Sequence, residues 1–509
     1  MWKVLFRARA SFARDQRGNV GILFGFAAIP LIGLLGGAVD MTRHNRYQAT
    51  LLNAMDAAAI ALVRRGAKDE TEADAFVNDY VAGIVPWLKS DTMLNLPALN
   101  AIEIDGGYRI EAKGSMDTAF LPVVGLRTMP LDLSTEVMMS GGKYEVALAL
   151  DNTGSMQNFG RIGALRDAAS QLVDDLYTEE GAEDRVKMAL IPFVTAVNVG
   201  TSEGFDLAWI DPVGADPLFH RNFSTPVDRL DLFENKMRVE WKGCVEARSE
   251  GDLDDTAPES RATRWVPYLW PDEPDDGYGN SYLDDSGARN DQNRLRDVAK
   301  YTVGRGTRVA NTTSAGPNAA CPGPVVPLTN DTTVMKSEIG KMKPHNERGG
   351  NNSGTNVAQG LVWAWRVLSP DAPFTQGASY KDDETQKVLV LLSDGRNQVV
   401  ANGGITESDY TSYGYLADGR MGSTDNYLTA EANVDAKVRE VCEGVKTTGI
   451  RLYTILFQVD FAKTQDLFRD CASKDENGEP LYFYVPQANQ LETAFREIGD
   501  DLTSLRVTR

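Results

Sequence analysis

The sequence "KYEVALALDNTGSM", residues 143–156, joins an apolar run to a group of polar residues. Its apolar run, Val146–Leu150, is continuous, which is typical of a strand that is buried on both faces of a sheet. Asp151 follows the run directly, and the hydroxyl residues Thr153 and Ser155 come at alternate positions after it. The stretch therefore predicts a buried strand that ends in a polar turn.

Strands and helices alternate along the rest of the chain from Lys143 onward. Further strands are predicted at "VKMALIPF" from Val186, "VLVLLSDG" from Val388 and "IRLYTILFQV" from Ile450. A helix is predicted at "VAQGLVWAWRVL" from Val357. Two further helices are indicated by apolar residues at helical spacing. The first set is Ile162, Leu165, Ala169, Leu172 and Leu176, and the second is Leu491, Phe495, Ile498, Leu502 and Leu505. This alternation predicts an α/β fold of the Rossmann type, a doubly wound and mostly parallel sheet covered on both faces. Ligands of such sheets bind beyond the carboxyl ends of the strands, where Asp151 and Asp394 both lie.

The turn at Asp151 lacks the signatures of two common sites. A phosphate loop needs G-x-x-x-x-G-K-[ST], and a nucleophile elbow needs G-x-S-x-G, but "NTGSM" has neither the lysine nor the first glycine. No histidine lies nearby in the sequence to act as a base. The remaining pattern, D-x-[ST]-x-S, offers oxygen ligands, which suit a hard divalent cation such as Mg²⁺.

The amino terminus predicts a membrane anchor. Residues 20–39, "VGILFGFAAIPLIGLLGGAV", carry no charge, and a helix of this length reaches roughly 30 Å, the thickness of the hydrocarbon layer. The basic residues before it are opposed only by Asp15; they are Lys3, Arg7, Arg9, Arg14 and Arg17. We therefore predict a cytoplasmic basic tail at 1–19, a transmembrane helix at 20–39 and an exported remainder. A cleaved signal peptide is the alternative, but its apolar region is normally about 7–15 residues long and no A-x-A site follows here.

Residues 40–142 predict a small α+β module. Its first helix continues from the anchor, with Leu51, Met55, Ala58 and Leu62 at helical spacing and a stop at residues 64–66. A second helix is expected at about 70–88, followed by strands at "LNAIEID", "GYRIEAKG" and "LDLSTEVMM". The first helix is rich in alanine, which favours either close packing on a neighbour or simply good helix propagation.

Charge and cysteine content narrow the class of protein. A net charge of −20 argues against nucleic acid as a partner, because phosphate recognition needs a basic surface. The four cysteines form no C-x-x-C pair, and in an oxidising compartment they are expected to form disulfides. Three pairings are open, and we favour the nearest neighbours, Cys244 with Cys321 and Cys442 with Cys471.

From residue 143 to residue 509 the chain resembles the von Willebrand factor A domain and its metal-ion-dependent adhesion site. Asp151, Thr153 and Ser155 match the Asp-x-Ser-x-Ser turn of that family, with a threonine replacing the first serine. Thr355 in "SGTNVAQGL" matches the distant threonine, and Asp394 in "LLSDG" the last aspartate. The resemblance implies that the three hydroxyls bind Mg²⁺, Mn²⁺ or Ca²⁺ directly or through water, and that the aspartates bind it largely through water. The open coordination position would accept a carboxylate from a protein partner.

One departure from that family is an insertion at about 200–342, far longer than such a domain needs. Its acidic clusters have no EF-hand spacing, so solvated loops are favoured over a Ca²⁺ site. Trp265, Tyr268 and Trp270 could anchor a partner or pack the insertion on the sheet, and we favour packing.

The whole arrangement also resembles the TadG-type proteins of the tight-adherence (Flp) pilus system. The likeness rests on "RGNVGILFGFAAIPLIGLLGGAVDM" and "LLNAMDAAAIALV" near the amino terminus and on "GPNAACPGPVVPLTND", "GLVWAWRVLSP", "TTGIRLYTILFQV" and "AFREIGDDLTSLRVTR" in the A domain. It implies a non-enzymatic inner-membrane protein with a periplasmic A domain that acts in pilus assembly or anchoring. Some relatives of the anchor region are processed by a peptidase, but no clear processing site is present here.

Two other functions remain open on the sequence alone. An adhesin would bind an external ligand through the same metal site, but it would need a route to the cell surface. A metal-dependent hydrolase would need a general base near the metal, and the matched positions offer none.

Overall fold

The computed structural model describes residues 19–503 and 506–508, apart from residues 66, 68, 97, 105–106, 139–142, 179–180, 201–204, 276–278, 286–287, 289, 313 and 346–353. The chain divides into two compact units, the first formed by Met1–Gly141 with Thr503–Arg509 and the second by Gly142–Leu502. The predicted basic tail, apart from its last residue, lies outside the described residues.

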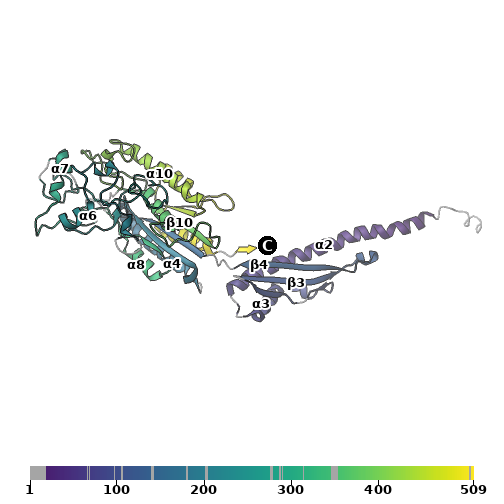
Figure 1. Cartoon of the computed structure of the whole chain (residues 1–509). Coiled ribbons are helices and arrows are strands. Elements are labelled where there is room, and N and C mark those ends of the chain that lie inside the picture. The colour runs from purple at the N-terminus through teal and green to yellow at the C-terminus, as the bar shows by residue number, and fades with distance from the viewer. Residues whose placement is uncertain are drawn as a thin grey trace, which may run out of the picture. The chain divides into compact units, whose positions relative to one another are not determined.

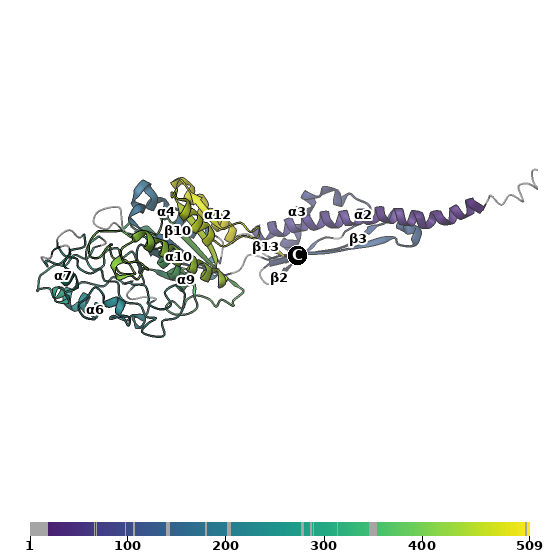
Figure 2. The ribbon, with the colours of Figure 1, turned by 90° about the horizontal axis from the view of Figure 1, so that it is seen from above.

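The first unit packs two helices on an antiparallel sheet (Figures 1 and 2). The helices are α2 (Asn19–Arg65) and α3 (Glu70–Ile84), followed by the short turn η2 (Pro86–Lys89). The strands are β1 (Leu94–Asn95), β2 (Asn100–Ile104), β3 (Gly107–Asp117), β4 (Thr128–Met138) and β13 (Arg506–Thr508). β3 and β4 form a long hairpin paired from Gly107–Met138 to Asp117–Thr128.

The core of the first unit lies between α2, α3 and the sheet. Leu51, Met55, Ala58 and Leu62 are buried, as their helical spacing predicts, and they share a cluster with Val77 of α3. The helix α2 ends at Arg65, within the predicted stop. Close packing is therefore one role of the alanine-rich stretch, since Ala54, Ala58 and Ala59 are buried in the same cluster.

The carboxyl terminus differs from its predicted place. The sequence assigns residues up to 509 to the second unit, but β13 pairs antiparallel with β4 and belongs to the sheet of the first unit. The partner of β13 is the edge of a sheet formed some 370 residues earlier in the chain, and local periodicity cannot reveal such a pairing. The second unit is thus inserted, along the chain, between two strands of the first.

The predicted membrane span forms the first part of α2. In the part of the chain that the structure describes, none of the helices is long and apolar enough to cross a membrane. The side chains at 19–23, 25, 28, 29 and 32 are outside that part. Several of the described side chains in the predicted span are large, apolar and exposed, namely Phe24, Phe26, Leu31, Leu34 and Leu35.

The second unit contains an eight-stranded, mostly parallel sheet (Figure 1). Its strands run in the order β12-β11-β10-β5-β6-β7-β8, with β9 paired to β6, and the first five are parallel. Their bounds are β5 (Lys143–Asp151), β6 (Val186–Phe193), β7 (Val197–Asn198), β8 (Cys244–Val245), β9 (Val326–Thr329), β10 (Thr385–Ser393), β11 (Arg451–Phe457) and β12 (Tyr482–Val485). The mixed α/β fold with a doubly wound sheet agrees with the alternation in the sequence.

Helices cover both faces of this sheet. One core cluster joins the sheet to α9 (Val357–Leu368), α10 (Tyr427–Thr447) and α11 (Ala462–Cys471). The other joins it to α4 (Arg161–Leu176), α8 (Thr332–Lys341) and α12 (Leu491–Thr503). Figure 1 shows α10 on one side of β10 and α4 and α8 on the other. The central strand β5 sends Ala147 and Ala149 to the first cluster and Val146, Leu148 and Leu150 to the second, so it is buried on both faces.

The predicted insertion at 200–342 ends inside the main fold, because its last elements, β9 and α8, belong to the sheet and its cover. The preceding part consists of loops and short turns, which are η5 (Leu207–Trp209), η6 (Pro217–His220), α6 (Arg229–Asp231), η7 (Leu232–Met237), α7 (Gln292–Arg296) and η8 (Val298–Tyr301). Trp265, Tyr268 and Trp270 are buried, and the ring of Trp265 lies 4.8 Å from that of Trp363 on α9. These aromatic residues therefore pack on the main fold, as we predict from the sequence.

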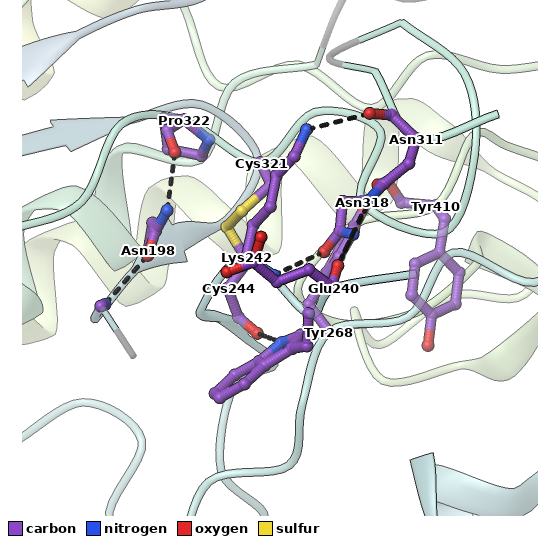
Figure 3. Close-up of a disulfide and its surroundings, with 12 residues drawn as sticks. Asn198, Glu240, Lys242, Cys244, Tyr268, Asn311, Asn318, Cys321, Pro322 and Tyr410 are labelled. Atoms are coloured by element: carbon purple, nitrogen blue, oxygen red, sulfur yellow. Dashed lines mark hydrogen bonds between the residues drawn. A yellow bond between two sulfur atoms is a disulfide. The ribbon is translucent and has the colours of Figure 1, made fainter. Parts of the chain in front are cut away.

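Both disulfides join the favoured nearest-neighbour pairs, Cys244 with Cys321 and Cys442 with Cys471. The first, which Figure 3 shows, holds the insertion next to the sheet, since Cys244 lies on β8 and the backbone of Tyr268 donates to its carbonyl. On the other side of the bond, the amide of Asn198 on β7 donates to the carbonyl of Pro322 at 2.9 Å. The second links the end of α11 to α10.

Candidate metal centre

The site begins where β5 ends. Asp151 is fully buried, and its two carboxylate oxygens are both engaged within the protein. Oδ1 accepts the backbone N–H of Thr153 at 2.7 Å, and Oδ2 accepts the hydroxyl of Ser393 at 2.6 Å. The aspartate therefore holds the turn closed and ties it to the end of the neighbouring strand.

Asp394 stands at the matching end of β10. The strands β5 and β10 are parallel neighbours with Leu150 opposite Leu392, which brings both strand ends together. Ser155 donates its hydroxyl to Asp394 Oδ1 at 2.6 Å, and the hydroxyl oxygens of Thr153 and Ser155 are 3.0 Å apart. Four of the five predicted metal ligands thus form one hydrogen-bonded group.

Thr355, the fifth, lies in the loop before α9. Its backbone N–H and carbonyl pair with those of Gln398, each at 3.0 Å. Among the described residues, no hydrogen bond joins its side chain to the other four predicted ligands. Its role in the site therefore stays a prediction.

The two aspartates of the site oppose each other's ionisation. Burial, together with the charge of Asp394, raises the pKa of Asp151 to about 7. Burial likewise raises the pKa of Asp394, although the hydrogen bond from Ser155 and the charge of Arg161 oppose the shift. Two buried carboxylates side by side resist ionisation together, because neither water nor enough positive charge offsets them.

Three residues of the site have no counterpart in the sequence prediction. Arg161, the first residue of α4, donates from Nη1 to Asp394 Oδ2 at 2.6 Å, and Ser393 donates to Asp151 as described. Asn152 is buried beside Asp151, and neither polar atom of its side chain has a partner among the described residues. Ser393 and Asn152 adjoin predicted ligands in the sequence, which is the one signal that could have found them. Arg161 carries no such signal.

A histidine, His345, also lies closer to the site than the sequence indicates. The backbone N–H of His345 donates to the carbonyl of Asn152 at 2.8 Å, although the two residues are far apart in the chain. Burial and the charges of Lys242 and Lys343 lower the pKa of His345 to about 4. This histidine is therefore neutral at pH 7. It also lines a cavity of about 640 Å³ that extends to Cys321 and Pro322 at the first disulfide.

The donor set fits a small, hard cation. It consists of two carboxylates and two hydroxyls at one strand edge, all oxygen ligands of the type that Mg²⁺ prefers. Within the described residues, no group of three or more His, Cys, Asp or Glu side chains could hold a metal ion. A metal here would therefore depend on the hydroxyls as well as on the two aspartates.

Fold and site together define a protein with a doubly wound α/β domain that carries a polar, oxygen-rich site at its strand ends. Residues 18–67 match the family profile described as "Putative Flp pilus-assembly TadE/G-like". A search of curated proteins found no significant match.

Several solved structures show partial similarity to the chain. The vWF domain of the type V pili tip protein Mfa5 from Porphyromonas gingivalis is 12% identical, covering 71% of this chain and 95% of that one, with a TM-score of 0.33. The PilB minor pilin from Streptococcus sanguinis is 12% identical, covering 81% of this chain and 78% of that one, with a TM-score of 0.32. Proximal thread matrix protein 1 from the mussel byssus, with a zinc occupied MIDAS motif, is 12% identical, covering 70% of this chain and 47% of that one, with a TM-score of 0.29.

Proposed function

We propose that this chain is a non-enzymatic, membrane-anchored factor in the assembly or anchoring of Tad (Flp) pili. Its second unit binds a protein partner through a divalent cation. The observation that carries the proposal is the meeting of Asp151 and Asp394 with the hydroxyls of Thr153 and Ser155 at adjacent strand ends. The match of residues 18–67 to a Tad family profile supplies the pilus context.

The anchor is the uncharged stretch Val20–Val39, placed across the inner membrane with the amino terminus in the cytoplasm. Its length, the basic residues before it and the exposed apolar side chains of Phe24, Leu31 and Leu34 support this placement. The bulk of the chain then lies in the periplasm, where disulfides persist. A phosphatase fused after Arg509 should therefore be active. An inactive phosphatase fusion, together with activity of a cytoplasmic reporter fused at the same place, would show that the topology is the opposite one.

The cation, Mg²⁺ or another divalent ion such as Mn²⁺ or Ca²⁺, is held by Asp151, Thr153, Ser155, Thr355 and Asp394. Bound there, it supplies a positive charge that accepts a carboxylate from the partner. The chain's own residues shape the site, because Asp151 closes the turn and Ser393 fixes its carboxylate. The partner is a pilus or envelope protein with an exposed acidic side chain.

The test compares Asp151→Asn with Asp167→Asn in cells that make the pilus. Asp167 is an exposed aspartate on α4, so its variant controls for loss of one negative charge in the same unit. Asp151→Asn should lose pilus output and divalent-dependent cross-linking to the partner, while Asp167→Asn keeps both. Normal pilus output from a folded, metal-free Asp151→Asn protein would contradict the proposal. Binding to an external ligand by protein on the cell surface would favour an adhesin, and metal-dependent hydrolysis by the purified chain would favour an enzyme.

A further inference from the structure

The turn of the long β3–β4 hairpin is unusually apolar. Residues 118–126, "TAFLPVVGL", carry no charge and include the short helical turn η3 (Leu121–Val124). Four of its large side chains are exposed, namely Phe120 (42%), Val123 (55%), Val124 (51%) and Leu126 (57%). We call residues 118–126 the hairpin tip. An exposed apolar cluster of this kind marks a surface that is covered by something else.

The hairpin tip is fixed to α2 by Asp40. The carboxylate of Asp40 is buried and accepts three backbone N–H groups, from Ala119 at 3.0 Å, Phe120 at 2.9 Å and Leu121 at 3.0 Å. Charge-assisted hydrogen bonds of this type are stronger than those between neutral groups. The hairpin tip is therefore held in one position on the helix.

Glycines on α2 let the hairpin tip come close. A Cβ atom at Gly36 would lie 2.3 Å from Cβ of Phe120, and one at Gly33 would lie 3.0 Å from Cγ1 of Val124. A Cβ atom at Gly37 would lie 3.2 Å from Cδ2 of Leu121. A side chain at Gly36 would push the hairpin tip away from the helix, whereas one at Gly33 or Gly37 would displace the end of the neighbouring side chain slightly. The tip thus lies along the helix from Asp40 back to Gly33.

These contacts set the depth of the hairpin tip relative to the proposed span. Gly33, Gly36 and Gly37 all lie inside Val20–Val39, and Asp40 is the first residue after it. Gly33 and Asp40 are seven positions apart on α2, which at the rise of an α-helix corresponds to roughly 10 Å. If α2 crosses the bilayer, Val124 lies at the level of Gly33, about 10 Å below the end of the span, a depth at which apolar side chains meet lipid tails.

The residues around the hairpin tip suit the edge of a membrane. Asp117 and Arg127 flank the tip and are exposed, so the charged part of the hairpin begins where the apolar part ends. On α2, Arg43 and Arg46 follow Asp40 by one to two turns and line a cavity with Tyr47 and Trp87. Tyrosine and tryptophan are enriched at the level of lipid headgroups, and arginine side chains near the end of a membrane helix extend to the same level.

We propose that the hairpin tip is inserted into the periplasmic leaflet of the membrane beside α2, as a second lipid contact of the first unit. The proposal rests on the anchor of the proposed function. Bilayer lipid is the occupant because the exposed side chains of the hairpin tip continue the apolar surface of the span itself. The insertion fixes the orientation of the first unit relative to the membrane, which a single helix cannot do.

The test places one thiol at a time in the full chain, reconstituted in vesicles of phosphatidylethanolamine and phosphatidylglycerol. The four native cysteines form two disulfides, so a cysteine introduced at Val123 is the one thiol open to an environment-sensitive dye. The matched positions are Leu31 in the span and Ser134 on β4, both exposed. Dye at positions 123 and 31 should shift to the blue and be quenched by lipid-attached spin labels. Dye at position 134 should be quenched by aqueous iodide.

The outcomes separate the two proposals. If the dye at position 31 is in lipid and the dye at position 123 is in water, the insertion of the hairpin tip is contradicted but the membrane anchor is not. Dye in water at both positions would overturn both. A Val124→Asp substitution adds a charge at an exposed site and should move the dye at position 123 into water while the dye at position 31 stays in lipid. Unchanged lipid quenching at position 123 in this variant would also contradict the proposal.

Discussion

The guanidinium of Arg161 lies 2.6 Å from the carboxylate of Asp394, measured from Nη1 to Oδ2, at the strand edge where a cation is proposed to bind. The same side chain donates from Nε to Oε1 of Gln458 at 2.8 Å, which fixes its direction. Arg161 is therefore a built-in counter-charge for one of the two aspartates. A divalent cation would have to share Asp394 with it.

Removing this counter-charge should strengthen metal binding. In Arg161→Gln, the positive charge beside Asp394 is removed. The hydrogen bond from Arg161 to Asp394, which as a bond to a charged group contributes about 1.5–3 kcal/mol, then no longer competes with the metal ion for this carboxylate. We expect the Kd for Mg²⁺ or Mn²⁺ to fall by about tenfold, the equivalent of 1.4 kcal/mol, as measured by titration calorimetry on the purified chain. Arg439→Gln, at an exposed position on α10, is the control. Equal affinities in the variant and the wild type would show that Arg161 and the metal do not share Asp394.

The two simplest changes at Asp151 should separate stability from metal binding. Asp151→Asn keeps a polar group within reach of the Thr153 N–H and the Ser393 hydroxyl. Asp151→Ala leaves the Thr153 N–H without its acceptor, while the Ser393 hydroxyl keeps the carbonyl of Gly395 at 3.1 Å as an acceptor. Because unsatisfied buried polar groups cost about 1–3 kcal/mol, the alanine variant should lose about 2 kcal/mol of unfolding free energy and the asparagine variant under 1 kcal/mol. Metal binding should be lost in both. Loss of metal binding in the alanine variant alone would mean that the turn geometry, and not the carboxylate charge, holds the ion.

The sequence predicts the framework of this site because the framework is local. A continuous apolar run such as Val146–Leu150 has to be an inner strand, and a residue that directly follows such a strand has to lie at its carboxyl end. Parallel pairing of β5 and β10 then brings Asp151 and Asp394 together. Arg161, by contrast, reaches Asp394 by the rotamer of a long side chain, which no spacing encodes.

Pairings between distant segments were also beyond the sequence. The strand β13 finds its partner in β4, and His345 reaches Asn152, through contacts that form only when the whole chain is folded. The short strands β7 and β8 have two residues each, too few for any periodicity to show. The sequence places the end of the insertion too late, at about residue 342, for the same reason, since β9 has four residues.

Loss of either disulfide should weaken the second unit, because each bond restricts the unfolded chain. The bonds close loops with sequence separations of 77 for Cys244–Cys321 and 29 for Cys442–Cys471. Loop-closure entropy then gives about 4.5 and about 3.5 kcal/mol. Replacing both members of one pair by alanine should lower the unfolding free energy in that order, as measured by guanidinium denaturation. A larger loss for the 442–471 pair would show that native contacts, and not loop length, set the contribution.

The last prediction concerns Asp418, which is buried and distant in sequence from the proposed metal ligands. Its Oδ2 accepts the side-chain amide of Asn222 at 2.7 Å and the backbone N–H of Tyr415 at 2.8 Å. Burial outweighs these hydrogen bonds and raises the pKa of Asp418 to about 6. The folded state therefore holds a proton that the unfolded state releases at a pH near 3.9, the ordinary value for aspartate.

Because the folded state binds more protons between those two values, its stability falls as the pH rises from about 4 to about 6 and is then constant. The shift of about two pKa units corresponds to about 3 kcal/mol. Asp418→Asn removes the titration and keeps an oxygen that can accept both hydrogen bonds. The stability of the wild type minus that of the variant should fall by this amount between pH 4 and pH 6, as measured by denaturation at each pH. A difference that is flat over this range would mean that Asp418 ionises freely in the folded protein, with water or a cation beside it.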